Sequence, residues 1–204
     1  MASDTDSANV ALRLVGATPI TSLTDGSDNA NVVDDIFTEL LDDMLRSHPW
    51  NFSTKRVQLA RLVTAPAFEF DYAYAHPADW LRTISVHDND AGHGTVLYRT
   101  EQVDGQNVIV SSSDAIYLRY VYRVTDQSLM SADFRRAFQL ALARDLSLPL
   151  ASSNTMQDAY SREASRALAR ARSSDALGSF PELRPRGSWA SSRGGFKRDD
   201  FLSD

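Results

Sequence analysis

The stretch Ser47–Arg56, SHPWNFSTKR, separates two different patterns of hydrophobic residues. Before it, apolar side chains recur about every four residues, as in an amphipathic helix; after it, β-branched and aromatic residues predominate, as in strands. Pro49 cannot continue a helix and disfavours helical backbone at His48. We therefore predict a structural junction, at which Trp50 and Phe52 point to one side of the first strand and seal a sheet against helices.

The segment before this junction predicts two helices. Between residues 32 and 45, apolar side chains recur in pairs every four residues, which is typical of an amphipathic helix. Ser27, Asp28 or Asn29 can cap its start. A shorter helix is expected over residues 10–15. The polar face of the longer helix is acidic and includes Asp35, Glu39 and Asp42.

The segment after the junction predicts a small, mainly antiparallel sheet. Strand-like runs of β-branched and aromatic residues occur at 57–63, 96–100, 108–110 and 116–122. The pair Asp104-Gly105, between the second and third runs, is typical of a tight hairpin turn. The residues from His87 to His93 are rich in Asn, Asp and Gly, so we expect a polar loop at the tip of a hairpin.

Helical periodicity returns in the last third of the chain. Ser131 can cap a helix that Pro149 would stop, and another helix is expected over about 154–176. The alanines of this last helix suit close packing against other helices. It also carries a basic stripe at four-residue spacing, formed by Arg162, Arg166 and Arg170.

The order of these elements predicts the fold class. Two helices precede the sheet and two follow it, which favours an α+β protein that is mainly α. We expect an antiparallel helical bundle built from residues 1–48 and 131–176, with residues 49–130 inserted as a small antiparallel β-sheet module. Residues 177–204 are expected to form an extended or disordered C-terminal arm, because their isolated aromatics bury too little apolar surface to offset backbone ordering.

The arm combines cations with aromatic side chains, and a segment of this kind can wrap around a partner and become ordered on it. Charge is uneven along the whole chain, whose net charge is −6: acids are in excess over residues 1–50 and bases over residues 131–204. This asymmetry indicates different partners at the two ends, or contacts between copies, or only a solvated surface. The arm residues expected to dock are Phe180, Arg184, Arg186, Trp189, Arg193 and Phe196.

Several kinds of chemistry have no support in the sequence. The chain of 204 residues has no cysteine, which excludes disulfides, thiolate nucleophiles and cysteine-bound zinc. It also has no nucleophile elbow, phosphate-binding loop or dinucleotide motif, and no apolar run long enough to cross a membrane. We therefore predict a soluble protein of the cytoplasm that is not an enzyme and needs neither a cofactor nor a metal.

Two other functions stay open on the residues alone. The stripe of Arg162, Arg166 and Arg170 would suit a small nucleic-acid-binding regulatory protein, although an acidic chain is unusual for that role. The imidazoles and carboxylates between His87 and His93 would suit a metal-dependent hydrolase, although their spacing matches no ligand pattern that we can justify.

Several short strings, taken in order, resemble the tail tubular protein A family and related head-to-tail adaptor (connector) proteins of tailed bacteriophages. They begin with Leu14–Leu23 (LVGATPITSL), the acidic helix and His48–Phe52 (HPWNF). Further on come Tyr74–Arg82 (YAHPADWLR), in which His76 stands where a leucine is commoner, and Tyr120–Asp126 (YVYRVTD) before an alanine-rich helix. The resemblance lies in this ordered combination along most of the chain.

This resemblance implies a non-enzymatic structural protein of the virion. Such proteins form a ring, typically a dodecamer, that docks under the portal protein, extends the DNA channel and carries the tail or nozzle proteins. DNA would pass through without sequence-specific binding, and no membrane is involved. The expected location is the head–tail junction, after synthesis in the cytoplasm of a host bacterium. The arm would grip the portal, while the acidic residues Asp35, Glu39 and Asp42 would meet Arg162, Arg166 and Arg170 of a neighbouring subunit.

Overall fold

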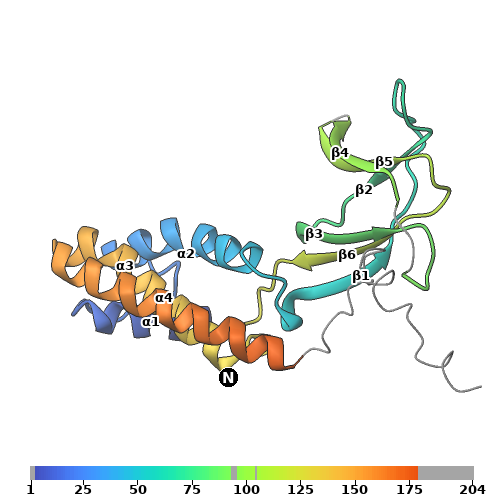
Figure 1. The fold of residues 1–204 in the computed structure, drawn as a ribbon. Helices are drawn as coiled ribbons and strands as arrows, with labels where there is room; N and C mark the ends of the chain where they lie inside the picture. The colour runs from blue at the N-terminus through green and yellow to red at the C-terminus, as the bar shows by residue number, and fades with distance from the viewer. Residues whose placement is uncertain (1–2, 93–95, 104, 179–204) are drawn as a thin grey trace, which may run out of the picture.

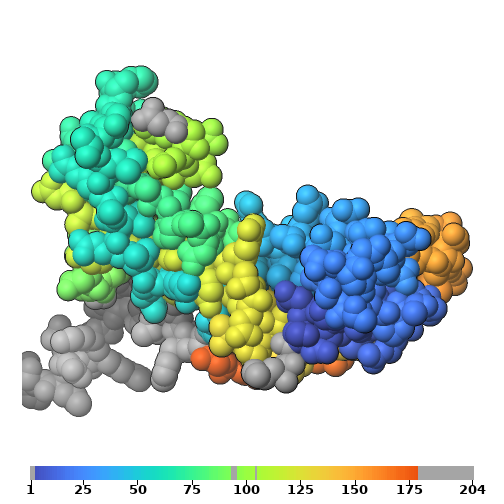
Figure 2. All heavy atoms as spheres, turned by 180° about the vertical axis from the view of Figure 1, so that it is seen from behind, coloured from blue at the N-terminus to red at the C-terminus, as the bar shows by residue number. Residues whose placement is uncertain are grey.

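Helices gather at one end of the molecule and strands at the other (Figure 1). This structure is a computed structural model that describes residues 3–92, 96–103 and 105–178. The space-filling view shows the segment that follows the last strand lying between the two parts (Figure 2, yellow). The described α-helices are α1 (Asp4–Leu14), α2 (Asp28–Arg46), α3 (Ala132–Ala151) and α4 (Asn154–Leu177).

The strands form two antiparallel sheets of three strands each, in the orders β1-β6-β3 and β2-β5-β4. Of the residues that the structure describes, 47% are helical and 21% are in strands, so the fold is a mixed α+β fold. Our prediction of a mainly α fold, a helical bundle with one small inserted sheet, is wrong. The strands are β1 (Thr54–Gln58), β2 (Tyr72–Ala75), β3 (Trp80–His87), β4 (Tyr98–Val103), β5 (Gln106–Ser111) and β6 (Tyr117–Tyr122).

The two strands that sequence reasoning missed explain this error. β2 has only four residues, too few to establish an alternating pattern. β3 is longer, but its pairing with β6 shifts register between Trp80 and Arg82 and again between Thr83 and Ser85. Each shift breaks the two-residue period by which a strand is recognised. The hairpin predicted around Gly105 is confirmed, because β4 and β5 pair on either side of it and Gly105 has a φ of +78°.

Serine caps begin the helices: Ser131 is the cap that the sequence predicts, and Ser27 is one of its three candidates for α2. The side chains of Ser27 and Ser131 accept hydrogen bonds from the backbone N–H groups of Ala30 and Phe134, at the starts of α2 and α3. The prediction that Pro149 stops α3 is wrong, since the helix continues to Ala151. Pro149 removes the backbone N–H that would bond to the Asp145 carbonyl, and the helix ends two residues later instead of at the proline.

α3 is the centre of the helical part. It packs against α1, α2 and α4, and the rings of Phe37 and Phe138 meet edge-on with centroids 5.0 Å apart. The same apolar cluster continues into the first sheet through Leu81 of β3 and Val121 of β6. The helices and the β1-β6-β3 sheet therefore share one hydrophobic core.

The second sheet is held by smaller clusters. One of them joins the two sheets and includes Tyr74 and Ile109 from one side and Leu118 and Tyr120 from the other. The Tyr74 hydroxyl donates a hydrogen bond of 2.6 Å to the carbonyl of Ser113. Through this cluster the β2-β5-β4 sheet packs against the first sheet, which in turn packs against the helices.

Candidate interaction surfaces

The junction places two aromatic rings against the helical core. Trp50 is fully buried, and its indole N–H donates to the Met44 carbonyl at 3.1 Å. Its ring stacks on Phe52 with centroids 5.9 Å apart and meets Phe134 of α3 edge-on at 4.9 Å. The backbone differs from the expected strand, because residues Asn51–Ser53 form a short 3₁₀ turn and β1 starts only at Thr54. Turn geometry, and not strand alternation, brings the two rings together.

α2 ends ahead of Pro49, as the sequence indicates. The last helical residue is Arg46, and the hydroxyl of Ser47 donates to the Met44 carbonyl at 2.7 Å. The backbone N–H of Trp50 then donates to the His48 carbonyl at 2.9 Å, which turns the chain toward β1.

Sequence reasoning missed a contact that fastens this junction to the end of α4. The Asn51 backbone N–H donates to the Asp175 carboxylate at 3.1 and 3.3 Å, and the Asn51 side chain donates to the Asp175 carbonyl at 2.7 Å. His48 Nε2 lies 3.4 Å from the same carboxylate, and Arg172 donates to the Ser47 hydroxyl at 3.1 Å. A carboxylate in the last turn of a helix interacts unfavourably with the helix dipole. From the sequence, this unfavourable position of Asp175 is the feature that could have indicated a stabilising partner.

The acidic stripe of α2 is only partly free. Asp35 and Glu39 are exposed and form no ion pair within the part of the chain that the structure describes. Asp42 is instead paired with Arg123, which follows β6 and donates from both Nε and a terminal nitrogen. The hydrogen bond to Asp42 raises the pKa of the Arg123 guanidinium. Asp42 therefore joins α2 to the strand region within one chain.

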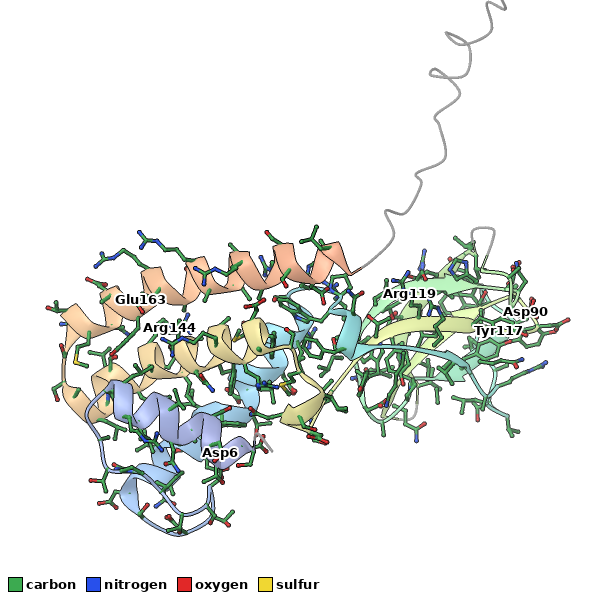
Figure 3. All side chains as sticks on the ribbon, turned by 90° about the horizontal axis from the view of Figure 1, so that it is seen from below. Asp6, Asp90, Tyr117, Arg119, Arg144 and Glu163 are labelled. Atoms are coloured by element: carbon green, nitrogen blue, oxygen red, sulfur yellow. The ribbon has the colours of Figure 1, made fainter. Side chains whose placement is uncertain are left out.

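The basic stripe of α4 lies on the side of the helix away from α3. Arg162, Arg166 and Arg170 are exposed, whereas the buried residues Ala164 and Ala171 face the core. Figure 3 shows nitrogen-tipped side chains projecting outward from this helix. Within the described part of one chain, the acidic stripe of α2 and the basic stripe of α4 therefore form no ion pairs with each other.

A shallow groove lies where α2, α3 and α4 meet. Small and medium apolar side chains line it, and Asp43 and Arg144 add charge. Arg144 is held by a two-point ion pair with Asp145, which raises the pKa of the guanidinium. The apolar lining consists of Leu40, Met44, Ala137, Ala141, Ala164 and Leu168.

The segment between His87 and Gly92 is a polar turn, but it does not close a hairpin. β3 pairs with β6 and β4 pairs with β5, so this segment connects the two sheets. His93 and all six of the arm residues named for docking lie outside the described residues. Within residues 3–92, 96–103 and 105–178, no group of three or more side chains is placed to hold a metal ion.

None of the described helices combines the length and apolar character needed to span a lipid bilayer. No protein-family model matches the chain, and no curated protein is significantly similar to it.

Proposed function

We propose that the chain is a structural assembly protein that forms the ring-shaped head-to-tail adaptor of a tailed bacteriophage. The observation that supports this most directly is the separation of charge on the helical part. Asp35 and Glu39 on α2, and the arginine stripe on α4, are exposed and unpaired among the described residues of the same chain. Opposite charges that cannot meet within one subunit are suited to meet between two subunits.

Such an interface is heterologous, since one surface of a subunit contacts a different surface of its neighbour. Repeated contacts of this type close into a ring when the rotation between subunits allows it. Each exposed ion pair contributes only about 0–1 kcal/mol. The groove between α2, α3 and α4 adds apolar surface mainly from the half-buried side chains of Leu40 and Leu168. We therefore expect a weak interface that becomes stable when the portal protein gathers many copies.

The other parts of the chain then have distinct roles in this proposal. The helical part sets subunit packing, the two sheets provide the surface for tail or nozzle proteins, and residues 177–204 grip the portal. Excess acid repels the phosphates of DNA, so an acidic channel wall lets DNA slide without being held. The chain acts by assembly and carries out no reaction.

A charge-exchange experiment tests this proposal. Two paired variants, Asp35→Lys with Glu39→Lys and Arg166→Asp with Arg170→Asp, should each prevent ring formation on the portal, observed by negative-stain imaging and analytical ultracentrifugation. The chain that carries all four substitutions should form rings again, because the two stripes have exchanged sign. Glu101→Lys, on the exposed strand β4, is the matched control and should assemble like the wild type.

Three results would contradict the proposal. Wild-type protein that forms no ring with portal would remove its central claim. Paired variants that assemble normally, or a four-substitution chain that stays unassembled although it is folded, would show that these stripes do not meet. Salt-sensitive retention on duplex DNA that is lost in the Arg166→Asp, Arg170→Asp variant would favour the nucleic-acid-binding alternative instead.

A further inference from the structure

One side of the strand β4 is unpaired among the described residues. β4 lies at an edge of the β2-β5-β4 sheet, with β5 on its inner side. Figure 1 shows no helix beside its outer side. Five of the six residues of this strand are exposed, and its sequence, YRTEQV, contains no proline that would prevent pairing. The strand can therefore offer backbone N–H and C=O groups to a strand of another molecule.

The hairpin determines which backbone groups of β4 point outward. Its loop has two residues, so the flanking residues Val103 and Gln106 form a hydrogen-bonded pair. Along an antiparallel strand, such residues alternate with residues whose backbone groups point the other way. Leu97 agrees with this alternation, because its carbonyl accepts a hydrogen bond of 2.9 Å from the Ser111 hydroxyl of β5. The residues whose backbone groups point away from β5 are therefore Tyr98, Thr100 and Gln102.

The charges of β4 are complementary to those of a second copy that runs antiparallel to it. Outward backbone groups must face each other, so a symmetric pairing that uses most of the strand is centred on residue 99, 100 or 101. When it is centred on Thr100, Arg99 of each copy lies opposite Glu101 of the other. When it is centred on Arg99 or Glu101, two like charges lie directly opposite, which is unfavourable. Charge therefore favours the register centred on Thr100.

The side chains that this register brings together are accessible. Glu101 is exposed and forms no ion pair within the described part of the chain. Arg99 lies 3.1 Å from Glu69, but its side chain is 61% exposed and a guanidinium has five N–H donors. Arg99 can therefore bind Glu69 of its own chain and Glu101 of the second copy. The same register places Leu97, which is 79% exposed, opposite Val103 of the second copy.

We propose that two copies of this chain associate through β4, which joins their β2-β5-β4 sheets into one continuous antiparallel sheet. The backbone of Thr100 pairs with Thr100 of the other copy, and Tyr98 pairs with Gln102 in both directions. A single pair of strands is a small interface, so the dimer is weak. The contact is isologous, whereas the proposed ring contact is heterologous and uses α2 and α4. The two contacts are therefore independent of each other.

The experiment is sedimentation equilibrium of the full chain without portal. We expect a monomer–dimer equilibrium with a Kd on the order of 100 μM at low salt. Glu101→Arg and Arg99→Glu should each weaken association at least roughly tenfold, because like charges then lie opposite each other. An equimolar mixture of these two variants should associate again, since each strand then faces charges opposite to its own. Arg56→Glu, on the exposed part of β1, is the matched control and should associate like the wild type.

Thr100→Pro tests the backbone part of the contact. Proline removes an outward N–H and no hydrogen bond to β5, so the variant should fold but stay monomeric. The proposal is overturned if the wild type is monomeric at about 1 mM, if the dimer persists in Thr100→Pro or Glu101→Arg, or if the mixture of folded charge variants stays monomeric. Association that is lost in the Arg166→Asp, Arg170→Asp variant would also overturn it, since the helical stripes would then form the contact. Rings that fail to form on the portal would leave this dimer unaffected.

Discussion

The helical part and the β2-β5-β4 sheet bury apolar side chains in different ways. α3 is surrounded by three other helices, and residues such as Phe134, Phe138 and Leu142 are wholly inaccessible to solvent. In the second sheet, β4 is exposed over almost its whole length, and Phe68 in the loop before β2 remains 81% exposed. We infer that the helical part supplies most of the free energy of unfolding and that the second sheet opens locally at a lower cost.

This contrast suits a protein whose two ends have different roles. In the proposed ring, a rigid helical core would fix the geometry of repeated subunit contacts, whereas a less buried sheet could adjust to a partner. The junction and the β1-β6-β3 sheet connect the helical part to the second sheet, because they belong to the same hydrophobic core as the helices. Substitutions along this path should have effects that decline from the core outward.

Trp50→Ala should have the largest effect. The indole is fully buried between α2 and α3, and removing it leaves a cavity beside Phe134 that the rigid helices cannot close. We expect a loss of about 3–5 kcal/mol in the free energy of unfolding, measured by urea denaturation. Ring assembly should fail as a consequence. Trp80→Ala, at a partly exposed ring stacked on His76, is the control and should cost less. A wild-type melting temperature for Trp50→Ala would contradict this prediction.

The junction also shows how much of this molecule can be predicted from the sequence. The change of period at Pro49 correctly indicates where α2 ends, because helix termination is a local property of the chain. The prediction of the first strand at 57–63 is wrong, since β1 is Thr54–Gln58. The contact between Asn51 and Asp175 spans 124 positions, and no local pattern specifies it. Likewise, β2 and β3 are strands because β5 and β6 pair with them, so their own residues carry too weak a signal.

The candidate sites follow the same rule. Four-residue spacing on α4 correctly predicts that three arginines share one exposed face, since a helix fixes the relation between its own residues. The sequence cannot show that Arg123 reaches Asp42, or that β4 lies at the edge of its sheet. Both relations depend on strand order and on the packing of distant elements.

Asp175→Asn should have an intermediate effect, because it weakens the contact between α4 and the junction without opening a cavity. The carboxylate is 9% exposed and accepts from the Asn51 backbone, and charge-assisted hydrogen bonds are the stronger kind. We expect a loss of about 1–2 kcal/mol in the free energy of unfolding, together with faster hydrogen exchange at the end of α4. Asp158→Asn, exposed near the start of the same helix, should change stability by no more than about 0.5 kcal/mol. Equal effects of the two substitutions would show that the contact contributes nothing.

Asp79→Asn should change the free energy of unfolding least, and the change should be seen mainly in how stability depends on pH at acidic values. Burial disfavours the charged carboxylate, but hydrogen bonds from Lys55 at 2.7 Å and from the Tyr120 hydroxyl at 2.9 Å outweigh it and lower the pKa of Asp79. A lowered pKa in the folded state means that this carboxylate stabilises the protein above the unfolded value of about 4, and that the contribution is lost as pH falls through the folded pKa.

The side chain of Asp79 is 33% exposed, so solvent screening limits this contribution to about 0.5–1 kcal/mol at pH 7. Asp79→Asn should remove it and make the fall in stability below about pH 4 shallower, as measured by urea denaturation at several pH values. Asp71 is an exposed acid in the same part of the chain. Asp71→Asn should leave the loss of stability below about pH 4 as steep as in the wild type. An equally steep loss of stability in acid for Asp79→Asn would show that this carboxylate does not contribute to the pH dependence of the fold.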